Sequence, residues 1–199
     1  MHSLEQSTKQ QFAKVFASRD WRLFKEVAEI NFAEAAALKM ASFRAIPFQR
    51  RLLIRNIRKR LLIGIGTELL LKAAYLKLGY GINRLQGNAI GPKLPFRLAN
   101  LGQQELDPNE TYTLGQLADQ FKKVVQLPNP DLVLDGLRIA KVFRNKEGHV
   151  VTQSHRFNPS SYRAIEAALV EIYSRVFAQA LTVRFSFTAD EKGVWRVEL

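Results

Sequence analysis

"LLIGIGTELLLKAAYLKLGYGI" spans residues 61–82 and is the most apolar stretch of this 199-residue chain. It carries Glu68, Lys72 and Lys77, and charges at this spacing are costly inside a bilayer. The stretch therefore predicts a buried helix of a cytoplasmic protein with no integral membrane association.

The residues on either side set the limits of this helix. Pro47 precedes it and Gly79 follows it, which predicts a long helix over about residues 48–78. Upstream, residues 9–42 contain neither Gly nor Pro and are rich in Ala, Glu, Lys and Leu. That composition predicts another long helix before Pro47.

Downstream, Gly and Pro recur through residues 81–109, which predicts a long irregular segment. Shorter helices follow, each introduced by a residue type that caps helix N-termini or by a proline at the first helical position. These starts are Thr113, Asn129 with Pro130, and Asn158 with Pro159.

The tail changes its period. "TVRFSFT" (residues 182–188) and "VWRVEL" (residues 194–199) alternate apolar and polar residues around the turn-like "ADEKG". This alternation predicts a C-terminal β-hairpin over residues 182–199. The fold prediction is a single domain over residues 1–199, mainly α, a bundle of about five helices with this hairpin appended.

The net charge of +12 favours a polyanionic partner, with nucleic acid first and an anionic membrane surface or an acidic protein second. Charge kept only for solubility is the alternative. The chain has no cysteine, no phosphate-binding glycine motif and no cluster of side chains at metal-ligand spacing. We therefore predict neither a cofactor nor a metal.

"FQRRLLIRNIRKR" (residues 48–60) has six cations and no acid. Arg51, Arg55 and Arg58 form one stripe of the predicted helix and Lys59 lies beside it. Such a helix is suited to follow a phosphate backbone. The alternatives are an anionic membrane surface, an acidic antitoxin or regulatory protein, or a solvated face.

"FRNKEGHVV" (residues 143–151) gathers Arg144, Asn145, Lys146 and His149. Arginine binds phosphate through its fixed fork of donors, and histidine exchanges protons near neutral pH. Together they suit RNA cleavage by internal attack of a 2′-hydroxyl. Arg144 and His149 would lie about 140° apart on a straight helix. A solvated helix end is the alternative.

The Arg-Asn-x-x-x-His spacing of Arg144, Asn145 and His149 resembles the signature of HEPN domains (higher eukaryotes and prokaryotes nucleotide-binding). The resemblance implies a helical bundle, a homodimer that brings two motifs into one cleft and, in active members, metal-independent endoribonuclease activity. Many members are toxins or antiviral effectors. Some are modified on a Tyr just after the His, where this chain has Val150 and Val151.

Two further candidates adjoin the motif. HEPN domains often place an acidic residue on an earlier helix near the motif arginine, so Glu68 would orient Arg144. A local Glu68–Lys72 pair on one helix is an equally good prediction. His155 precedes a predicted helix start, where phosphate binds readily, although a loop histidine without a role is the alternative.

The functional prediction is a metal-independent endoribonuclease, a toxin or antiviral defence effector, that yields a 2′,3′-cyclic phosphate and a 5′-hydroxyl. His149 would act as general base or acid, Arg144 would stabilise the phosphate, and Asn145 would hold the motif or the substrate. Lys146, His155 and the basic stripe would contact RNA. The alternatives are a non-catalytic HEPN-like binding or assembly protein and a basic helical adaptor unrelated to HEPN.

Overall fold

The structure, a computed structural model, describes residues 3–17, 19–38, 47–85, 94–101, 106–147, 158–183, 185, 187–189 and 195–197. Within these residues the chain is mainly helical, as predicted. The α-helices are α1 (Leu4–Ala17), α2 (Trp21–Ala37), α3 (Phe48–Lys77), α4 (Leu114–Gln120), α5 (Pro130–Glu147) and α6 (Pro159–Ile172). Short turns of other helix types are η1 (Leu98–Asn100), η3 (Phe121–Lys123) and the π-helical η4 (Tyr173–Phe177).

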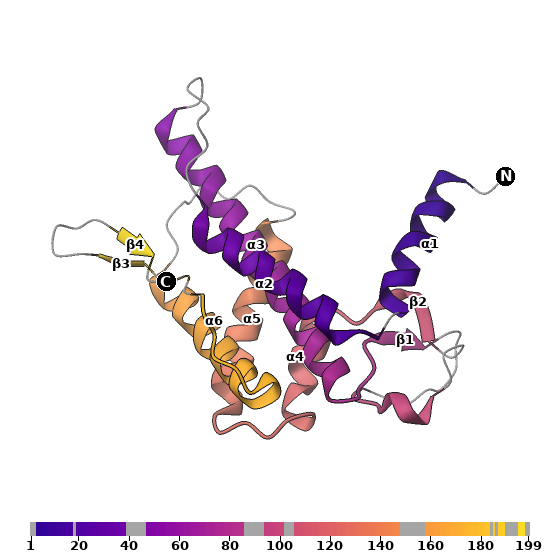
Figure 1. The fold of residues 1–199 in the computed structure, drawn as a ribbon. Coiled ribbons are helices and arrows are strands. Elements are labelled where there is room, and N and C mark those ends of the chain that lie inside the picture. The colour runs from indigo at the N-terminus through magenta and orange to yellow at the C-terminus, as the bar shows by residue number, and fades with distance from the viewer. Residues whose placement is uncertain are drawn as a thin grey trace.

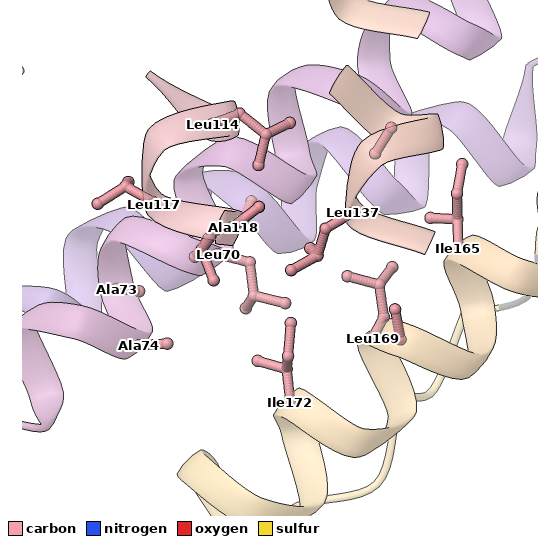
Figure 2. Close-up of a cluster of buried hydrophobic side chains, with 14 of the residues drawn as sticks. Leu70, Ala73, Ala74, Leu114, Leu117, Ala118, Leu137, Ile165, Leu169 and Ile172 are labelled. Atoms are coloured by element: carbon pink, nitrogen blue, oxygen red, sulfur yellow. The ribbon is translucent and has the colours of Figure 1, made fainter. Parts of the chain in front are cut away.

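Helix α3 is the centre of the bundle (Figure 1). Helix α2 packs along one side of α3, and α5 contacts both α3 and α6. Figure 2 shows the apolar interior where α3, α4, α5 and α6 meet. Its labelled members include Leu70, Leu117, Leu137, Leu169 and Ile172, all of which are fully buried. Among the described residues, none of the helices has the length and apolar character needed to cross a membrane.

The predicted limits of α3 are confirmed. Pro47 directly precedes its first turn. At the other end Gly79 has φ +79°, a left-handed conformation that glycine adopts without steric cost. The Tyr80 amide then donates to the Tyr75 carbonyl at 2.8 Å, which closes the helix as a capping motif.

The prediction of one long helix over residues 9–42 is wrong, because the chain breaks between α1 and α2. Arg19 has φ 50° and Asp20 caps α2, its side chain accepting a hydrogen bond from the Arg22 amide at 3.0 Å. An aspartate N-cap satisfies donors that an uninterrupted helix would have paired internally. Helix α1 consequently stands apart from the bundle, against β2 (Figure 1).

The predicted starts of the later helices are confirmed. Thr113 and Gln116 form a reciprocal capping box at the start of α4. Pro130 is the first residue of α5. Asn158 caps α6 by accepting from the Ser160 amide at 3.0 Å.

Two pairs of short antiparallel strands complete the fold. β1 (Asn83–Leu85) pairs with β2 (Leu106–Thr111), a hairpin-like pairing that the Gly- and Pro-rich composition did not predict. β3 (Phe187–Ala189) pairs with β4 (Trp195–Val197), which confirms the C-terminal hairpin. β3 begins later than predicted because Phe185 is buried in the helical core, its ring 5.4 Å from that of Phe32.

Candidate functional site

The C-terminal half of α5 lies against the middle of α3 with almost no space between the two backbones. A methyl group built on Gly64 would lie 2.8 Å from both the backbone N and the Cβ of Arg144. No real Cβ contact is that short, so the absence of a side chain at Gly64 is what allows this approach. Gly64 therefore sets the position of Arg144 relative to α3.

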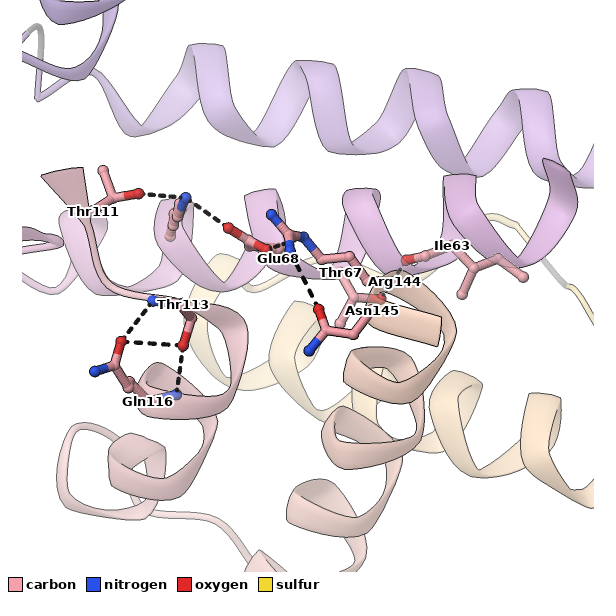
Figure 3. Close-up of polar contacts among 9 residues, drawn as sticks. Ile63, Thr67, Glu68, Thr111, Thr113, Gln116, Arg144 and Asn145 are labelled. Atoms are coloured by element: carbon pink, nitrogen blue, oxygen red, sulfur yellow. Dashed lines mark hydrogen bonds and ion pairs between the residues drawn. The ribbon is translucent and has the colours of Figure 1, made fainter. Parts of the chain in front are cut away.

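Glu68, one helical turn beyond Gly64, forms ion pairs with two cations at once. Its Oε2 forms an ion pair with Nε of Arg144, and its Oε1 lies 2.8 Å from Nζ of Lys72. Both of the alternative pairings predicted for Glu68 are thus present. The Lys72 ammonium also donates to Oγ1 of Thr111 on β2 at 2.8 Å. Figure 3 shows this chain of contacts running from β2 across α3 to α5.

The three charged side chains of this cluster differ in how far they are buried. The Glu68 side chain is 9% exposed and that of Lys72 is 6% exposed, whereas the Arg144 side chain is 42% exposed. A buried carboxylate needs charged or hydrogen-bonding partners. Two cations on one carboxylate leave a local excess of one positive charge, and that excess is presented at the surface by Arg144.

Asn145 contacts the same guanidinium. Its Oδ1 accepts a hydrogen bond from Nη1 of Arg144 at 3.3 Å (Figure 3). An arginine has five N–H donors, and the contacts of Arg144 to Glu68 and Asn145 use only some of them within the described part of the chain. Arg144 is thereby held through Nε and Nη1, while its side chain stays 42% exposed. Lys146, next on the helix, is exposed.

A second ion pair ties the last turn of α5 to α3. Nε of Arg60 lies 2.5 Å from Oε1 of Glu147, and these side chains are 0% and 1% exposed. The Tyr162 hydroxyl lies beside this pair. Burial raises the pKa of Tyr162, and the charge and hydrogen bond of Arg60 oppose that rise. The end of α5 is therefore held against α3 by the buried Arg60–Glu147 pair, which the sequence did not predict.

The basic helix is only partly at the surface. Arg58 is exposed and Arg51 is half-buried, but Lys59 is 1% exposed, and its Nζ donates to the Phe185 carbonyl at 2.8 Å. Burial, with a smaller contribution from the charge of Arg55, lowers the pKa of Lys59 to about 7, although the charge of Glu166 opposes the change. The prediction that Lys59 lies on a nucleic-acid-binding surface is therefore corrected.

Arg55, the middle member of the predicted stripe, is half-buried and its Nε donates to the Leu38 carbonyl at 2.8 Å. The inward turn of this stretch follows from helix geometry. The buried stripes through Leu70 and Leu71 continue backwards in steps of three and four residues until they reach Lys59 and Arg60. Continuing the helical spacing of the apolar residues into the basic segment would therefore have identified Lys59 and Arg60 as buried.

His149 and His155 lie outside the described residues, so the structure places Arg144, Asn145, Lys146 and Glu68 but not the two histidines. In the described ranges no group of three or more His, Cys, Asp or Glu side chains is arranged to hold a metal ion.

Comparisons with protein-family models, with curated proteins and with solved structures gave no match. The assignment of the chain to the HEPN superfamily stays a prediction, which rests on the spacing of Arg144, Asn145 and His149.

The close contact at Gly64 leads to a first prediction. Gly64→Ala should lower the free energy of unfolding by about 1–2 kcal/mol, because overpacking against fixed backbone atoms costs more than the gain of about 1 kcal/mol in helix propensity. It should also displace Arg144 relative to α3. Urea unfolding followed by circular dichroism measures the first effect.

Gly115→Ala is the matched control. The three atoms nearest to a methyl group at Gly115 belong to the flexible end of the Lys141 side chain, which can move aside. We expect its stability to equal or slightly exceed that of the unsubstituted protein. Equal stability of both alanine variants would contradict the tight approach of α3 and α5.

Proposed function

We propose that the protein is a metal-independent endoribonuclease of HEPN-like type. The observation that supports this most is the state of Arg144: a half-exposed guanidinium oriented by a buried carboxylate that is itself held by Lys72. An arginine fixed in this way stabilises charge that develops on a phosphate without needing to reorganise during the reaction.

In the proposed reaction His149 removes the proton from a ribose 2′-hydroxyl. The 2′-oxygen attacks the adjacent phosphorus, the bond from phosphorus to the 5′-oxygen breaks, and the departing 5′-oxygen takes up a proton. The products are a 2′,3′-cyclic phosphate and a 5′-hydroxyl. Arg144 stabilises the additional charge on the phosphoryl oxygens, and Asn145 fixes the guanidinium from the solvent side.

Exposed cations next to Arg144 support RNA as the substrate. Lys141 is exposed and lies three residues before Arg144, so the two share one face of α5. Arg138, three residues earlier again, is paired with Asp119 at 3.1 Å and contributes less free charge. A row of cations on one helix face follows a phosphate backbone. The proposal includes a homodimer that joins two such faces, and a role as a toxin or defence effector.

The test is RNA cleavage by purified protein in EDTA, with the chemistry of the product ends determined. We expect cleavage without metal and products that end in 2′,3′-cyclic phosphate. Protein purified in parallel with Arg144→Ala and His149→Ala together controls for contaminating nuclease and should not cleave.

Other results would overturn the proposal. Cleavage that needs a divalent ion, or equal cleavage by the double variant, excludes this mechanism. RNA binding that depends on Arg144 without any cleavage would instead favour the non-catalytic binding protein.

A further inference from the structure

A pocket of about 260 Å³ lies where the start of α2, the end of α3 and η4 meet. Lys77, one of the residues that line it, comes nine residues after Glu68 on α3. At 100° per residue that places Lys77 on the opposite side of α3 from Glu68. The pocket is therefore separate from the Arg144 site, and the residues of the proposed nuclease do not account for it.

Aromatic rings form one wall of the pocket. The ring centroids of Trp21 and Phe177 are 5.7 Å apart, and the ring of Tyr173 is 5.8 Å from that of Phe177. Phe177 ends the π-helical turn, after which Ala178 reverses the chain at φ 55°. Trp21 is half-buried, so part of its indole faces the pocket. An aromatic wall of this kind binds a nucleobase by stacking.

Two exposed cations face the same rings. Nζ of Lys77 lies 4.9 Å from the Trp21 centroid and 5.0 Å from that of Phe177, and the Arg22 guanidinium lies 5.2 Å from Trp21. Both residues are exposed and line the pocket. An ammonium and a guanidinium close to an aromatic wall suit a phosphate attached to a planar group.

The other charged residues that line the pocket indicate which kind of ligand it can bind. Lys25 is paired with Glu29 at 2.5 Å, and Glu29 also accepts from the Tyr173 hydroxyl, so these two charges neutralise each other. Glu26 is exposed at the pocket edge. Its carboxylate would repel a bare anion, but it can accept hydrogen bonds from hydroxyl groups, as carboxylates do from ribose. The favoured ligand thus carries a planar base, hydroxyls and one phosphate.

We propose that this pocket binds a ribonucleoside monophosphate. The base stacks on the half-buried Trp21, which the buried Phe177 supports from within, the ribose hydroxyls donate to Glu26, and Arg22 and Lys77 bind the phosphate. The volume fits one nucleotide rather than a strand. The site is independent of RNA cleavage and requires no residue of α5.

Trp21 itself reports binding. The chain has two tryptophans, so Trp195→Phe leaves Trp21 as the only indole. Adenosine 5′-monophosphate titrated into this protein should quench the fluorescence of Trp21. Adenosine, ribose 5-phosphate and inorganic phosphate, each lacking part of the ligand, should each bind about tenfold more weakly or worse. The 2′-deoxy monophosphate should bind more weakly than the ribonucleotide.

Substitutions assign the contacts. Arg22→Gln and Lys77→Gln should each weaken binding of the monophosphate about tenfold. Glu26→Gln should reduce the preference for ribose over deoxyribose. Lys123→Gln, an exposed lysine on η3 outside the pocket, is the control and should bind as the unsubstituted protein does.

Three results would overturn the proposal: the absence of quenching at millimolar monophosphate, equal affinity for inorganic phosphate, or unchanged affinity in both Arg22→Gln and Lys77→Gln. Circular dichroism verifies that each variant is folded. RNA cleavage by the same variants should be normal, so failure of this proposal is distinguishable from failure of the nuclease proposal.

Discussion

Replacing Arg144 with Ala should lower the rate of RNA cleavage by about 100- to 1000-fold, the loss seen when one preorganised donor to a transition-state charge is removed. The effect should fall mainly on kcat, because the guanidinium acts on charge that develops during the reaction. Rates of cleavage of a short RNA at several substrate concentrations, with EDTA present, provide the measurement.

The same substitution should change stability little. The Arg144 side chain is 42% exposed, and Glu68 keeps its contact with Lys72 at 2.8 Å when Arg144 is removed. We expect a loss of about 1 kcal/mol in the free energy of unfolding. A large fall in cleavage with a small fall in stability thus separates a catalytic arginine from a structural one.

Two controls sharpen this test. Lys146→Ala removes an exposed cation from the same turn of α5 and should reduce cleavage only a few-fold, through weaker RNA binding. Arg144→Lys keeps the charge but loses the fork of donors, and should fall between the alanine variant and the unsubstituted protein. Equal rates for Arg144→Ala and Lys146→Ala would show that Arg144 contributes only general positive charge.

The sequence predicted the local signals well. The limits of α3 follow from Pro47 and Gly79, and the starts of α4 and α6 follow from Thr113 and Asn158. These features depend on residues within one turn of each other, so their chemistry is visible in a short window. The alternating pattern of the C-terminal hairpin is also visible in a short window, so the hairpin was predicted. Its first strand was predicted to begin too early, because the burial of Phe185 depends on helices that are distant in the sequence.

The site was predicted less completely, because ion pairs join residues far apart in the sequence. Glu68 had two equally good partners, and a carboxylate with two oxygens takes both. Arg60 is one of the six cations of the basic segment, although its helical period places it with the apolar stripe. Its partner Glu147 is 87 residues away, a pairing that no local pattern indicates.

Glu147→Ala should destabilise the protein more than any other substitution considered, lowering the free energy of unfolding by about 3–5 kcal/mol. Arg60 and Glu147 are 0% and 1% exposed, so the alanine variant would leave the Arg60 charge without this carboxylate in the interior. Urea unfolding should show a lower midpoint with an unchanged slope, since the surface exposed on unfolding is nearly the same.

The expected loss of stability in Glu147→Ala comes from the buried Arg60 charge that remains, and not from the lost attraction between the two residues. A double substitution tests this directly. Arg60→Met combined with Glu147→Met replaces the pair with apolar side chains and should recover most of the stability. Asp119→Ala breaks the exposed Arg138–Asp119 pair, whose side chains are 60% and 50% exposed, and should cost less than about 1 kcal/mol. A Glu147→Ala variant within 1 kcal/mol of the unsubstituted protein would contradict the buried pair.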